Sequence, residues 1–151
     1  ARVFPSAALA MDRPNPRNAL GTALLSSATA CADISDGLAQ DLGHILERSG
    51  VDADVLWDAV PKHPALAALS QEQQVEAAMS GGDDYELVFT APADKRGLIE
   101  QASISALTPV TRIGRIIEKK QSGAPLAIRD ASGRPLFLPV QGFDHFAQGA
   151  D

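Results

Sequence analysis

The 151-residue sequence has little cysteine, a deficit of basic residues and no long apolar run. Its single cysteine, Cys31, cannot form an internal disulfide, which suits a reducing compartment. We therefore expect a cytoplasmic location, and we interpret Cys31 as a small buried hydrophobe. Lys and Arg number 13 against 19 Asp and Glu, a net charge of -6, which argues against sequence-independent binding of nucleic acid. Because no apolar run approaches the ~18 residues of a membrane span, we expect no membrane partner either.

Several motifs that define enzyme classes are also missing. The sequence contains no G-x-x-x-x-G-K-[ST] phosphate loop, no protein-kinase motif, no nucleophile elbow and no Cys-x-x-Cys pair. The three histidines, His44, His63 and His145, do not have the spacing of metal ligands. Internal repeats and low-complexity tracts are absent. Any chemistry must therefore come from other residues.

Residue patterns predict a single domain of mixed helices and strands. Residues 1–28 begin with a proline-rich lead-in, and apolar periodicity and turn residues then define the elements. A capping box at Ser70 and Gln73 starts one helix, and Gly50 ends another. Because helices and strands do not alternate strictly, we predict an α+β fold with a mixed sheet. The expected helices cover 18–27, 36–49, 63–69, 71–79 and 92–102. The expected strands cover 28–34, 51–61, 85–91, 110–117 and a hairpin within 125–140.

The stretch "ADISDGLAQDL" crowds acidic residues where a strand ends and a helix begins. Asp33, Ser35 and Asp36 could cap the helix, whose first amides lack partners. Two carboxylates and a hydroxyl at a strand end equally suit a hard cation such as Mg²⁺. The residues alone leave these two interpretations open. Asp41, further along the helix, is expected to be solvated.

Two further stretches could carry function. In "SGGDDYELVF", Gly81 and Gly82 permit a tight turn or a close approach to a ligand, and Asp83 and Asp84 follow. A solvated polar turn is the alternative, although a second acidic turn in one small domain favours a site. In "QGFDHF", Phe143 could anchor the tail on the core or stack on a planar ring.

Together these stretches resemble the C-terminal domain of the thiamine-monophosphate kinase family, within the AIR synthase superfamily. The matching runs are "DISDGLAQDLGHI" at 33–45, "SGGDDYELVFT" at 80–90 and "GFDHF" at 142–146. The resemblance implies a three-layer α-β-α domain with a mixed sheet. It also implies phosphorylation of thiamine monophosphate to thiamine diphosphate, with ATP as co-substrate and Mg²⁺ as cofactor.

The resemblance also assigns roles to individual residues. Asp33 and Asp36 would bind magnesium, Ser35 would contact ATP, and Asp83 and Phe143 would contact thiamine monophosphate. The family usually has glutamate at the position of Asp83, which is one methylene shorter.

The resemblance covers only part of the family's architecture. It makes residues 1–28 a lead-in from an N-terminal domain and residues 29–151 the C-terminal domain. The full enzyme would be a homodimer, and the chain alone would be inactive. The alternatives are a non-catalytic ligand-binding module of the same fold, or another ATP-dependent enzyme of the superfamily.

Overall fold

The computed structural model describes residues 15–137, which form four α-helices, three short 3₁₀ turns and six strands within that range. The α-helices are α2 (Asn18–Leu24), α3 (Leu38–Ser49), α4 (Gln71–Ser80) and α5 (Arg96–Ser105). The strands are β1 (Ala30–Asp33), β2 (Val51–Leu56), β3 (Leu87–Thr90), β4 (Gly114–Glu118), β5 (Leu126–Arg129) and β6 (Pro135–Leu136). The 3₁₀ turns are η1 (Trp57–Ala59), η2 (Pro64–Ala68) and η3 (Ala93–Lys95).

The strands form two separate sheets. β1 and β3 are antiparallel, with Ala30 opposite Thr90 and Asp33 opposite Leu87. The larger sheet has the order β4-β2-β5-β6, and only its β2–β5 pair is parallel. The predicted α+β class with a mixed sheet is therefore confirmed, as is the hairpin now seen as β5 and β6.

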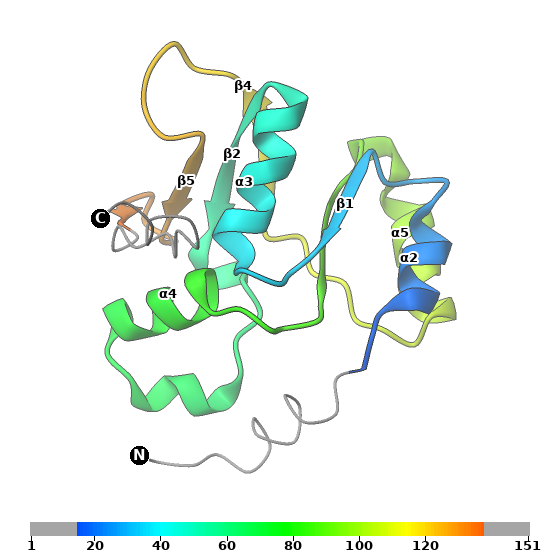
Figure 1. The fold of residues 1–151 in the computed structure, drawn as a ribbon, viewed down its shortest axis with the longest axis horizontal. Coiled ribbons are helices and arrows are strands. Elements are labelled where there is room, and N and C mark those ends of the chain that lie inside the picture. Colours follow the sequence, from blue (N-terminus) through cyan, green and yellow to red (C-terminus); the bar gives the residue numbers. More distant parts are fainter. Residues whose placement is uncertain (1–14, 138–151) are drawn as a thin grey trace, which may run out of the picture.

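Layers of helices enclose the β1–β3 pair. Figure 1 shows this pair between α3 on one side and α2 with α5 on the other, which gives the expected α-β-α arrangement. The larger sheet packs on α3 through β2, so α3 lies between both sheets. The main core fills the space around α3 and includes Leu46 and Met79, both fully buried. A smaller core around Leu20, Leu24 and Ala102 joins α2 to α5.

Predicted helix ends agree with the structure where side chains or glycines define them. The Ser70 hydroxyl accepts the Gln73 amide and the Gln73 side chain accepts the Ser70 amide, so the capping box is present. Gly50 ends α3 in the left-handed conformation. Predictions without such signals were less accurate, because α2 ends at Leu24 and α3 begins at Leu38. Within residues 15–137, every helix is too short or too polar to cross a bilayer.

Candidate functional site

The acidic turn between β1 and α3 exposes its polar side chains. Asp33, Ser35 and Asp36 are all exposed to solvent. The residue at the N-cap of α3 is Gly37, with φ of 118°, and no side chain caps the helix. Of the two interpretations left open by the sequence, helix capping does not account for these residues. Among residues 15–137, the Asp33 carboxylate has no hydrogen-bond or ion-pair partner, which leaves it available to a ligand.

Asp41 organises this turn from within the helix. Its Oδ2 accepts the backbone N–H of Ser35 at 2.9 Å and that of Asp36 at 3.1 Å. Only 6% of Asp41 is exposed, so the expectation that it is solvated was wrong. A buried carboxylate is stable when it accepts such bonds. Asp41 thus pairs with the backbone amides of Ser35 and Asp36, while the side chains of these two residues remain exposed to solvent.

The glycine-rich loop after α4 packs directly on the acidic turn. The Asp83 N–H donates to the Ser35 carbonyl oxygen at 3.0 Å. A Cβ on Gly82 would lie 2.4 Å from the same oxygen, so this position requires glycine. The two acidic stretches that the sequence singled out therefore meet at one backbone atom.

The loop keeps an unusual backbone. Asp83 has φ of 62° and Tyr85 has φ of 54°, a left-handed conformation that glycine usually adopts. For residues with a Cβ this conformation costs roughly 1–2 kcal/mol each. Strain of this kind persists where surrounding contacts impose it, and such sites are often functional.

An ion pair holds the far end of the loop. Arg17 donates from Nε to Glu86 Oε2 at 2.9 Å and from Nη2 to Oε1 at 2.5 Å. This two-point pairing raises the pKa of the Arg17 guanidinium. The Glu86 carbonyl also accepts the Ile34 N–H at 2.8 Å. Sequence reasoning missed this pair, because its residues are 69 positions apart and follow no periodic pattern.

A groove of about 600 Å³ runs along the same face. Asp33 and Cys31 line it from β1, and Tyr85 lines it from the loop. The sequence predicted a buried Cys31, but this residue is exposed. The reason is strand alternation: Ala30 and Ala32 pack towards α3, so Cys31 and Asp33 point to the opposite face. The other lining residues are Pro16, Arg17, Asn18, Gly21, Thr22, Leu25 and Leu87.

Negative charge dominates the electrostatics of this face. Partial desolvation, followed by the charges of Glu86 and Asp83, raises the pKa of Asp84 above its ordinary value. Partial desolvation and then the Asp33 carboxylate raise the pKa of the Cys31 thiol. The thiol is therefore mostly protonated at neutral pH and is a weak nucleophile. A site of this charge favours cations or metal-bound phosphates.

The described residues fit part of the ligand set of a magnesium ion rather than all of it. Asp33 and Asp36 offer the carboxylate oxygens that Mg²⁺ prefers, and protein Mg²⁺ commonly takes one or two carboxylates plus substrate phosphates. Within the described part of the chain, no three acidic, histidine or cysteine side chains gather closely enough to hold a metal alone. The predicted ring-stacking residue, Phe143, lies outside the described residues.

Comparison with known proteins places this arrangement in a family. The family model described as "AIR synthase related protein, C-terminal domain" matches residues 9–126. Thiamine-monophosphate kinase of Haemophilus influenzae is 42% identical over 138 residues, which cover 90% of this chain and 42% of that protein. The chain thus spans well under half the length of this curated relative.

Solved structures agree. The crystal structure of thiamine-monophosphate kinase from Stenotrophomonas maltophilia K279a matches with a TM-score of 0.73 and 44% identity, over 82% of this chain and 38% of that one. AaThiL complexed with AMPPCP and TMP matches with a TM-score of 0.66 and 27% identity, over 89% of this chain and 41% of that one. The predicted resemblance is thereby confirmed, and the chain belongs to the family of AIR synthase related proteins, as their C-terminal domain.

Proposed function

We propose that this chain is the C-terminal part of a kinase that converts thiamine monophosphate to thiamine diphosphate with ATP and Mg²⁺. The observation that carries the proposal is the junction of the two acidic turns at the Ser35 carbonyl, in a chain 42% identical to a thiamine-monophosphate kinase. The complex of AaThiL with AMPPCP and TMP supports the same pair of ligands.

In the proposed reaction a phosphate oxygen of thiamine monophosphate attacks the γ-phosphorus of ATP. A P–O bond forms there, the bond to the β–γ bridging oxygen breaks, and ADP leaves. Catalysis of such a transfer is mostly positioning and charge neutralisation. Bound magnesium would neutralise phosphate charge, and Asp33 and Asp36 would hold it.

The remaining assignments concern the two substrates. Ser35 would contact ATP, while Asp83 and Phe143 would contact thiamine monophosphate. The Asp83 amide donates a hydrogen bond to the Ser35 carbonyl, so a movement of the Ser35 backbone would also move Asp83. Asp41 has no ligand role in this proposal, since its Oδ2 already holds the turn.

The proposal extends to the whole protein. Because the chain spans 42% of the Haemophilus influenzae relative, we propose that an N-terminal domain of the same enzyme supplies the other ligands of the phosphate groups. We further propose that residues 29–151 form the C-terminal domain and that the whole enzyme is a cytoplasmic homodimer.

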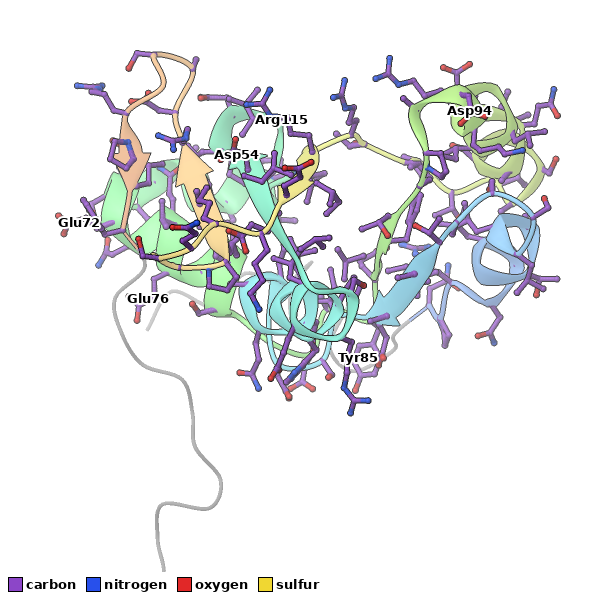
Figure 2. All side chains as sticks on the ribbon, turned by 90° about the horizontal axis from the view of Figure 1, so that it is seen from above. Asp54, Glu72, Glu76, Tyr85, Asp94 and Arg115 are labelled. Carbon is purple, nitrogen blue, oxygen red and sulfur yellow. The ribbon has the colours of Figure 1, made fainter. Side chains whose placement is uncertain are left out.

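The test uses the whole protein that contains this chain, assayed for thiamine diphosphate formation. Asp33→Asn and Asp36→Asn should each lower kcat/KM at least about 100-fold, because each removes charge stabilisation of the transferred phosphoryl group. Asp94→Asn is the matched control, since Asp94 lies on η3, away from the acidic turns (Figure 2). Unfolding of the two variants, or activity within a few-fold of wild type, would contradict the metal assignment. Binding of ATP by the wild type without turnover would favour the non-catalytic module instead.

A further inference from the structure

The Arg17–Glu86 ion pair joins three segments that converge on the site. Arg17 immediately precedes α2, and its carbonyl accepts the Gly21 amide at 2.8 Å. Glu86 ends the glycine-rich loop and accepts the Ile34 amide through its carbonyl. Because Ile34 lies between Asp33 and Ser35, the pair ties the start of α2 to the acidic turn through the loop.

The geometry of the pair separates it from an ordinary surface contact. Two donors of Arg17 meet both carboxylate oxygens of Glu86, a planar arrangement that lysine cannot reproduce. The Arg17 side chain is 25% exposed and that of Glu86 is 47% exposed. Both side chains are thus partly covered, and two parallel hydrogen bonds fix the relative orientation of the two groups, so the pair is suited to hold local geometry.

The loop between the two acidic turns needs such fixation. Asp83 and Tyr85 both hold a left-handed backbone that residues with a Cβ disfavour. The N-terminal end of the loop is held by the contact of Gly82 and Asp83 with the Ser35 carbonyl. At the C-terminal end, the holding contacts are the bond from Ile34 and the pair with Arg17.

We propose that Arg17 is a positioning residue: through Glu86 it holds Asp83 and Tyr85 in their left-handed conformation and so places Asp83 for the substrate. This inference rests on the proposed function, in which Asp83 contacts thiamine monophosphate. Arg17 itself need not touch the substrate, although it lines the same groove as Asp33 and Tyr85.

The test compares Arg17→Gln, Glu86→Gln and their combination in the whole protein. The control is Arg115→Gln, which breaks the 3.0 Å pair between Arg115 and Asp54 on the larger sheet. Figure 2 shows that pair well away from Tyr85. Hydrogen exchange of the peptide covering residues 81–86 should accelerate on the order of tenfold in both single variants and no further in the combination. The control should leave this exchange unchanged.

Kinetics and rescue complete the test. Arg17→Gln should raise KM for thiamine monophosphate on the order of tenfold while changing kcat and KM for ATP less than about threefold. The swap Arg17→Glu with Glu86→Arg should recover part of both effects. Unchanged exchange at 81–86, or faster exchange with an unchanged KM for thiamine monophosphate, would overturn the proposal. A wild-type protein that forms no thiamine diphosphate would instead defeat the proposed function, and the exchange data would still decide the role of Arg17.

Discussion

A single backbone oxygen, the carbonyl of Ser35, joins the two acidic turns at the scale of individual residues. It accepts the Asp83 amide and leaves no room for a Cβ at Gly82. Gly82→Ala should therefore push the loop off the turn, lower the free energy of unfolding by about 1–3 kcal/mol and reduce substrate binding.

A second glycine provides the control for this prediction. Gly43 lies inside α3, and a Cβ there would meet nothing within 4 Å. Gly43→Ala should raise the free energy of unfolding by about 0.5–1 kcal/mol, because glycine in a helix interior is less stable than alanine. Thermal or urea unfolding measures both variants. If both substitutions changed the free energy of unfolding in the same way, the Ser35 carbonyl would not exclude a Cβ at residue 82.

Asp84 makes the free energy of unfolding depend on pH. Its pKa is raised above the ordinary value of 3.8, first by partial desolvation and then by Glu86 and Asp83. A carboxyl with a raised folded pKa costs no stability below its unfolded pKa and costs the full amount once the pH exceeds its folded pKa. Asp84→Asn should therefore stabilise the protein at pH 7, by less than about 1 kcal/mol because the residue is solvent-exposed.

The measurement is the difference in free energy of unfolding between Asp84→Asn and wild type across pH. That stabilisation should shrink as the pH falls through the folded pKa of Asp84 towards 3.8. A constant difference from pH 7 to pH 3 would assign the effect to packing rather than to charge.

Secondary-structure elements were predictable wherever a local signal defines them. The capping box at Ser70, the glycine that ends α3 and the turn between β5 and β6 all act within a few residues. The start of α3 lies two residues later than the sequence predicts, because Gly37 with its φ of 118° separates the acidic turn from the helix. No local sequence pattern predicts this break.

Pairing between distant elements was not predictable in this way. The division into two sheets depends on β1 meeting β3 and β2 meeting β4, which brings together residues about 60 positions apart. For the same reason the sequence pointed to Asp33, Ser35, Asp36 and Asp83 through their motifs but missed the residues that hold them. Asp41 and the Arg17–Glu86 pair act through tertiary contacts that leave no spacing in the sequence.

At the scale of the whole molecule, the site lies at an open face rather than inside a closed cleft. The groove beside Asp33 borders α2 and β1, and the larger sheet lies on the other side of α3 (Figure 1). The main core around α3 is continuous and contains Leu46 and Met79 at full burial. The chain thus has the interior of a stable domain together with an incomplete set of ligands for phosphate.

This combination predicts that the 151-residue chain alone folds cooperatively but forms no thiamine diphosphate. Its core supports folding, whereas its described residues bring no three metal-ligating side chains together, and phosphoryl transfer needs the charge of several phosphate oxygens neutralised in line. A thermal melt by circular dichroism should show one transition, and a coupled assay with ATP, Mg²⁺ and thiamine monophosphate should show no product. The whole protein, assayed in parallel, is the control. Because both turns that meet at Ser35 are intact in the short chain, product formation there would mean that Asp33, Asp36 and Asp83 suffice for the chemistry, and the proposed contribution of an N-terminal domain would be wrong.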